Sequence, residues 1–169
     1  MTAVINNTEL DFSLNMCQLY KLSTVDIELY RDFFALYNER EKGIADGAQL
    51  LYIAYFCANI DNSSKLSEEQ FYKLLESDLT ALDEIYNALF HKKKDWNFAG
   101  IFERPSKNAI RYPKGYKLAD VEDYYTFFVL NLGVGDETFW NMDIEFLNNV
   151  AINKNAYDSY INFELEKKR

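Results

Sequence analysis

The single histidine, His91, is the side chain best suited to general acid–base catalysis near neutral pH. It follows a helical pattern that ends at Phe90 and precedes the lysines Lys92 to Lys94, so the helix dipole explains its position without catalysis. The sequence contains no H-E-x-x-H, G-x-S-x-G or Walker motif that would bring catalytic partners together. We therefore expect no enzymatic activity.

Metal binding is the next chemistry to consider, because Asp61-Asn62-Ser63-Ser64-Lys65 faintly resembles the start of a calcium loop. The sixth position of that loop is Leu66, where the turn needs glycine, and the twelfth is Tyr72, where a glutamate would bind the ion with both oxygens. A turn followed by a helix cap accounts for these residues better. The sequence predicts neither a metal site nor a cofactor site.

The two cysteines, Cys17 and Cys57, stand within apolar helical patterns and lack C-x-x-C spacing. This pattern predicts small buried side chains in a reducing compartment, with a single disulfide as the less favoured alternative. The N-terminal stretch MTAVINNTELDF has no basic segment followed by an apolar one, and no window approaches the ~18 apolar residues of a membrane span. We expect a soluble protein that does not enter membranes.

The overall charge narrows the classes of partner. A formal net charge of -9 disfavours nucleic acid, because binding to phosphates depends on lysine and arginine side chains that release counterions. Hydrophobic residues make up 49% of the chain and aromatic residues 17%, which is more than a core of this size needs. The surplus predicts aromatic side chains on a protein-binding surface.

The first ninety residues carry the patterns of a short β-element followed by helices. Alternating residues around an Asn-Asn turn in 3–14 predict a hairpin or a single strand. Helical periodicity then covers 14–23, resumes after Thr24, and is strongest between Gly47 and Asn59, where Asp46 is the expected N-cap. Further helices are expected from a capping box at Ser67 and Gln70, and from Asp78 to His91.

The remaining residues indicate a linker and a second, smaller helical block. Residues 95–117 contain both prolines and no helical period, whereas the pattern resumes after a cap at Asp120. Gly133 suits a left-handed helix end, Asp136 is the expected cap of a short turn, and Asp143 opens the last helix. We predict a mainly α protein with an N-terminal helical domain (1–94), a linker (95–117) and a C-terminal helical extension (118–169).

The order of these parts resembles the tail assembly chaperones of long-tailed bacteriophages of Gram-positive hosts. The resemblance is most specific in the C-terminal block, in Leu132-Gly133-Val134 and in Asp136-x-x-Phe139-Trp140-Asn141-Met142-Asp143-x-Glu145. It implies a non-catalytic chaperone in the cytoplasm of the bacterial host. In this family the N-terminal block keeps the tape measure protein soluble, and the C-terminal block recruits tail tube protein. Self-association is a further expectation.

The resemblance also gives a meaning to the stretch FHKKKDW (90–96). Members of the family are made as a short product and as a long product that arises by ribosomal frameshifting. Consecutive lysine codons are rich in adenine, which is typical of a slippery sequence. We therefore hypothesise that a short product ends soon after Lys94 and that this chain is the long form, although three cations after a helix end also have a plain structural explanation.

The contact residues expected from this comparison are aromatic. In the C-terminal block they are Phe139, Trp140, Tyr124, Tyr125 and Phe128, and in the N-terminal block they are Tyr52, Tyr55 and Phe56. Packing in the core is the competing explanation for each ring.

The alternative function is a cellular helical adaptor or scaffold domain. It would share every feature except the frameshift. A regulator that binds nucleic acid is disfavoured by the acidic balance, and an enzyme by the lack of grouped polar residues.

Overall fold

The N-terminus forms the predicted β-hairpin. In the computed structural model, which describes residues 1–39, 42–90 and 118–167, strands β1 (Thr2–Ile5) and β2 (Thr8–Asp11) pair antiparallel, with Ile5 opposite Thr8. Asn6 and Asn7 form the turn with φ values of 48° and 62°, a backbone conformation that asparagine tolerates better than most residues. Ile5 and Leu10 are buried, so the hairpin has one face in the core.

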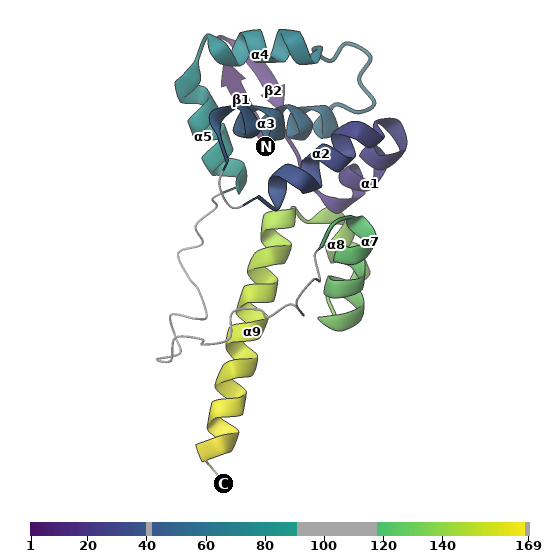
Figure 1. Ribbon diagram of the computed structural model, residues 1–169, viewed down its shortest axis with the longest axis vertical. Helices are drawn as coiled ribbons and strands as arrows, with labels where there is room; N and C mark the ends of the chain where they lie inside the picture. Colours follow the sequence, from purple (N-terminus) through teal and green to yellow (C-terminus); the bar gives the residue numbers. More distant parts are fainter. Residues whose placement is uncertain (40–41, 91–117, 168–169) are drawn as a thin grey trace.

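The rest of the described chain is helical, which confirms the predicted mainly α fold. The elements are α1 (Met16–Val25), α2 (Ile27–Tyr37), α3 (Ile44–Ala58), α4 (Glu68–Glu76), α5 (Leu79–Phe90), α7 (Val121–Tyr125), the π-helix η1 (Thr126–Asn131), α8 (Asp136–Asn141) and α9 (Ile144–Lys167). Figure 1 shows α3 crossing the body, with α4 and the hairpin on one side of it and α9 extending away on the other.

Helix α3 is the centre of the fold. Every residue from Leu50 to Cys57 is buried, and the helix packs against α1, α2, α4, α5 and β2. A helix that is apolar around its whole circumference must be surrounded by other elements, as the sequence predicted for this segment.

The helix starts follow local rules in most places. Ser67 Oγ accepts a hydrogen bond from the Gln70 N–H, and the Gln70 side chain accepts one from the Ser67 N–H, which is the predicted capping box. The prediction that Asp46 caps α3 is wrong. The helix begins one turn earlier, at an N-cap of Gly43, whose N–H donates to Asp46 Oδ2 at 2.6 Å.

The C-terminal part begins as predicted at Asp120, whose carboxylate accepts from the Asp123 N–H. Helix α7 then widens into η1, which ends at Asn131, and Gly133 follows the C-cap Leu132 with a left-handed φ of 72°. The prediction that Asp136 caps the next turn is wrong, because Gly135 occupies the N-cap position and Asp136 is the first residue of α8. The carboxylate of Asp136 accepts a hydrogen bond from the Tyr125 hydroxyl instead.

Residues 118–151 pack onto the N-terminal helices in one continuous hydrophobic core. The Val121 N–H donates to the Tyr30 hydroxyl at 3.0 Å, and the Ile144 N–H donates to the Leu14 carbonyl at 3.2 Å. The predicted boundary at residue 94 and the predicted linker 95–117 lie outside the described residues. In the described part, the two predicted blocks share buried side chains rather than facing each other across solvent.

Candidate protein-binding surface

Most of the aromatic residues predicted to contact partners lie in the core. Six of the eight rings are buried: Tyr52, Tyr55, Phe56, Tyr124, Phe128 and Phe139. Their surroundings give each a structural role. The Tyr55 ring stacks on Phe71 at 5.2 Å, and its hydroxyl accepts a hydrogen bond from the Leu66 N–H. In this conformation a partner cannot reach these six rings.

The other two predicted residues, Tyr125 and Trp140, are half-buried and lie together at the surface. Their ring centroids are 5.8 Å apart, and Trp140 also meets the edge of Tyr20 from α1 at 5.9 Å. Tyr20 itself is 48% exposed. We call Tyr20, Tyr125 and Trp140 the ring patch. Sequence reasoning missed Tyr20 as a surface residue, because its helical spacing marked it only as part of an apolar face.

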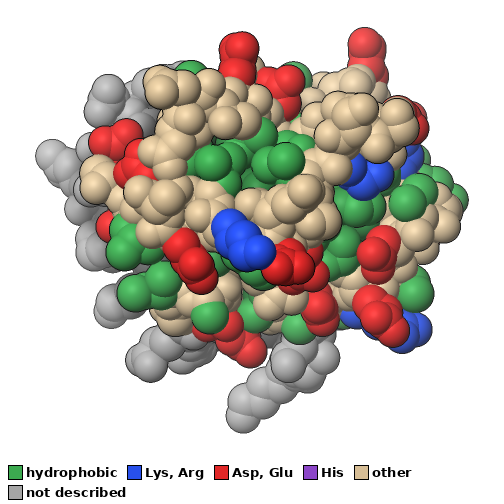
Figure 2. Space-filling view, turned by 90° about the horizontal axis from the view of Figure 1, so that it is seen from above, with side chains coloured by type: hydrophobic (Ala, Val, Ile, Leu, Met, Phe, Trp, Pro, Cys, Tyr) green, Lys and Arg blue, Asp and Glu red, His purple; other side chains and the backbone are tan. Residues whose placement is uncertain are grey.

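The ring patch has an acidic border. The Tyr125 hydroxyl donates a hydrogen bond to Asp136 Oδ1, with 2.8 Å between the two oxygens, and this hydrogen bond raises the pKa of Tyr125. Residues 118–153 contain seven Asp and Glu residues and no Lys, Arg or His. Acidic side chains also outnumber basic ones on the end of the molecule that carries α4 (Figure 2). The body is therefore acidic on more than one side.

A second apolar surface lies on the C-terminal half of α9. Tyr157, Ile161 and Leu165 are spaced four residues apart, so they follow one line along the helix, and their exposed fractions are 50%, 36% and 56%. We call these three residues the α9 row. With 24 residues the helix is about 36 Å long, and Figure 1 shows its C-terminal part extending past α7 and α8.

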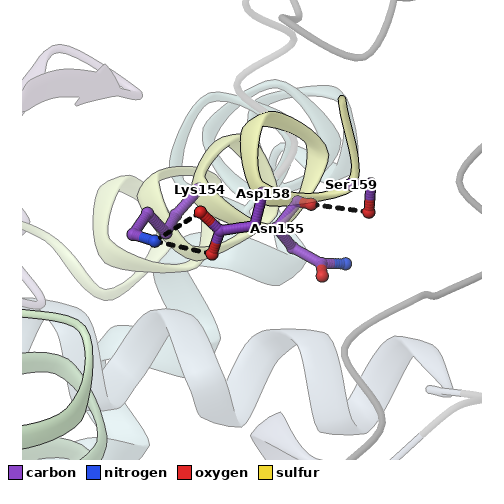
Figure 3. A network of polar contacts seen from close by, with 4 residues as sticks. All are labelled: Lys154, Asn155, Asp158 and Ser159. Atoms are coloured by element: carbon purple, nitrogen blue, oxygen red, sulfur yellow. Dashed lines mark hydrogen bonds and ion pairs between the residues drawn. The ribbon is translucent and has the colours of Figure 1, made fainter. Parts of the chain in front are cut away.

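Two polar contacts in the middle of α9 join residues of the same helix. The Lys154 ammonium group contacts both carboxylate oxygens of Asp158 at 2.6 Å, and Ser159 Oγ donates to the Asn155 carbonyl at 2.9 Å (Figure 3). An exposed pair four residues apart contributes roughly 0.3–0.5 kcal/mol to helix stability. The network shown in Figure 3 therefore supports the helix and has no composition suited to catalysis.

Tyr37, the last residue of α2, forms hydrogen bonds with the start of α9. Its hydroxyl donates to Glu145 Oε1 at 2.6 Å and accepts from Asn148 Nδ2 at 2.7 Å. Ile144, Leu147 and Ala151 are buried beside these contacts. Burial raises the pKa of Tyr37 well above its ordinary value of 10.0, and the negative charge of Glu145 raises it further. The hydroxyl thus remains protonated as a hydrogen-bond donor at neutral pH.

Replacing Tyr37 with phenylalanine is expected to lower the free energy of unfolding by about 1–3 kcal/mol, because two polar partners lose their hydrogen bonds. The raised pKa also makes stability depend on pH. A group that binds its proton more tightly in the folded state stabilises fully below its unfolded pKa, so this contribution is lost as the pH rises above about 10. In urea unfolding, the free energy of unfolding should decrease less above pH 10 for Tyr37→Phe than for the wild type. Equal losses in the two proteins would contradict this role, and Tyr157→Phe is the exposed control.

The cysteines differ from each other in exposure. Both are free thiols, so the disfavoured disulfide is absent from the structure. Cys57 is buried as predicted, and burial raises the pKa of its thiol to about 12. The prediction that Cys17 is buried is wrong, because α1 turns this residue toward solvent, three residues before Tyr20.

The described residues offer little for other chemistry. Within residues 1–39, 42–90 and 118–167, no three His, Cys, Asp or Glu side chains group in a way that could hold a metal ion. None of the described helices combines the length and apolar character needed to cross a bilayer. His91 and most of FHKKKDW lie outside the described residues.

An open hollow of about 340 Å³ lies between the start of α3 and α5. Among the described residues that line it, the charged side chains are Lys42 and Asp83, and the Lys42 ammonium group donates to the Glu39 carbonyl. This lining provides no nucleophile paired with a base.

No protein-family model matches this chain, and no curated protein or solved structure is significantly similar to it.

Proposed function

We propose that this protein is a non-catalytic tail assembly chaperone of a long-tailed bacteriophage. In this proposal it keeps the tape measure protein soluble and recruits tail tube protein in the cytoplasm of the bacterial host. The observation that carries the proposal is the α9 row, an exposed apolar line on a helix that extends from the body. The resemblance of residues 132–145 to the chaperone family supports the choice of client.

The α9 row has the form that an apolar helical client requires. Side chains at i, i+4 and i+8 form a ridge, and ridges of this kind pack into the grooves of a second helix. Ile161 is 36% exposed and Leu165 is 56% exposed, so burying these exposed parts would stabilise a complex by about 0.5–1 kcal/mol and about 0.8–1.7 kcal/mol respectively. A tape measure protein, which in this family is a long apolar helix-former, matches that chemistry.

The charge of the body supports a chaperone in a different way. With a net charge of -9, copies bound along one client repel each other, and the bound client stays in solution. The same charge disfavours nucleic acid as a partner. An acidic body with a local apolar contact surface fits reversible binding of an aggregation-prone protein.

The proposal is tested by co-expressing the chain with the tape measure protein encoded beside it. The soluble fraction of the tape measure protein is measured with and without this chain. We expect the client to move into the soluble fraction and to co-purify with the chain. A client that stays insoluble, or the absence of tail genes beside this one, would favour a cellular helical adaptor or scaffold instead.

The frameshift remains part of the proposal and has a structural consequence. A product that ends near Lys94 lacks the residues that cover α1 and α2, including Val121, Phe139 and Leu147. The short form would therefore expose apolar side chains that the long form buries. The nucleotide sequence tests the hypothesis, because a single uninterrupted frame through codons 90–120 without an overlapping second frame would exclude it.

A further inference from the structure

The ring patch is a rigid platform. Phe139 is fully buried and meets Tyr125 edge-on at 5.2 Å and Trp140 edge-on at 5.0 Å, so the two surface rings rest on a core side chain. The hydrogen bond from Tyr125 to Asp136 restrains the tyrosine from the other side. Aromatic rings that are already held in place lose little conformational freedom on binding, which makes them effective contact residues.

The border of the platform carries negative charge. Asp136 and Glu137 precede Trp140 on α8 by four and three residues, so both are neighbours of its ring on the helix surface. Both side chains are exposed. On α1, the cation next to Tyr20 is Lys21, which pairs with Asp61 at 3.6 Å. No other cation is present in α1, α7, η1 or α8.

This combination selects one class of partner. Lysine and arginine side chains bind both to carboxylates and to the face of a tryptophan ring, whereas apolar side chains pack against the same rings. Nucleic acids and anionic membrane surfaces present negative charge and are repelled by Asp136 and Glu137. A protein segment with basic and apolar side chains is complementary to the platform in both charge and polarity.

We propose that the ring patch binds a basic, amphipathic segment of a partner protein. The inference rests on the proposed function in one respect, because it gives the chemistry of a second partner, distinct from the client on the α9 row. Its test does not involve the client. The two surfaces lie on different elements, α1, α7 and α8 for the ring patch and the outer half of α9 for the row (Figure 1).

The chain provides its own reporter for the test. Cys17 is exposed and lies one helical turn before Tyr20, whereas burial raises the pKa of Cys57 to about 12 and keeps that thiol protonated. These are the only cysteines in the sequence. A thiol-reactive fluorophore added to the full chain at neutral pH therefore labels the α1 side of the ring patch.

The probe is a synthetic helical peptide of leucine and lysine, and its matched control has glutamate in place of every lysine. We expect saturable binding of the lysine peptide, measured by the fluorophore and by calorimetry on unlabelled chain, and no binding of the glutamate peptide. Trp140→Ala should weaken binding about tenfold or more, as is usual for a central aromatic contact. Glu137→Gln should weaken binding by a few-fold and reduce its dependence on salt, whereas Glu84→Gln on α5 should have a smaller effect.

Tyr20→Ala tests the ring patch independently if Trp140→Ala perturbs the fold, because Tyr20 is 48% exposed and contributes less to the core than a buried ring. Equal binding of the lysine peptide by the wild type and by both ring variants would overturn the proposal, since it would show general attraction to an acidic protein. Absence of binding would overturn it as well. If the peptide fails to bind while the tape measure protein is solubilised, this inference fails and the proposed function stands. If the peptide binds at the ring patch while the tape measure protein stays insoluble, the inference stands and the proposed function fails.

Discussion

Replacing Phe139 with alanine is expected to lower the free energy of unfolding by about 3–5 kcal/mol. The ring is fully buried and packs edge-on against Tyr125 and Trp140, so its removal leaves a cavity below the ring patch. Because a typical domain is stable by only about 5–15 kcal/mol, this single change should remove a large part of the total. Urea unfolding followed by circular dichroism measures the difference.

The matched control for this prediction is Thr138→Ala, at the exposed neighbouring position of α8. We expect the control to stay within about 0.5 kcal/mol of the wild type, as surface substitutions usually do. If Phe139→Ala weakened partner binding while leaving the unfolding curve unchanged, Phe139 would be a contact residue and its assignment to the core would be wrong.

The double variant Ile161→Glu, Leu165→Glu is expected to weaken binding of the tape measure protein by at least about tenfold. Because the side chains are 36% and 56% exposed, the two substitutions together remove about 1.4–2.7 kcal/mol of apolar burial, and 1.4 kcal/mol corresponds to a factor of ten in affinity. Placing a charge in an apolar helix contact adds a desolvation cost in the same direction. The affinity is measured with purified client, and the soluble fraction of the client is measured after co-expression.

Both side chains are partly exposed, at 36% and 56%, and both can turn an added carboxylate toward solvent. The fold should therefore be retained, and the far-ultraviolet circular dichroism spectrum should match that of the wild type. Ile161→Glu is compared with Asn162→Glu, which adds the same charge at the next residue, about 100° around the helix. The proposal requires a much larger loss for Ile161→Glu. Similar losses in the two single variants would mean that added charge, rather than the α9 row, disturbs binding.

Local features of this protein could be predicted from short stretches of sequence, because the groups that decide them lie within a few residues of each other. The turn at Asn6 and Asn7, the capping box at Ser67 and the helix end at Gly133 each depend on a backbone preference or on a side chain three residues away. The two wrong predictions of N-caps, at Asp46 and Asp136, placed the helix start three residues and one residue too late. At both helix starts a glycine took the N-cap position, and the aspartate nearby formed a different hydrogen bond.

The candidate surface was much harder to predict than the elements. The family resemblance named Phe139 and Trp140 alike as contact residues, yet α8 turns one ring into the core and leaves the other partly exposed. Tyr20 lies next to Trp140 only because α1 packs beside α8, and no short stretch of sequence predicts that packing. The widening of α7 into a π-helix at Thr126 also had no signal in the sequence.

By itself, the sequence determined that the chain folds into mainly α structure with an N-terminal hairpin, because periodicity, caps and turns are properties of neighbouring residues. It also determined the acidic net charge of -9 and the aromatic share of 17%. Only the tertiary structure decided which apolar side chains remain exposed. An amphipathic pattern shows that a helix has an apolar face, but the long-range packing of α1, α2 and α8 determines whether that face is covered by the same chain or left for a partner.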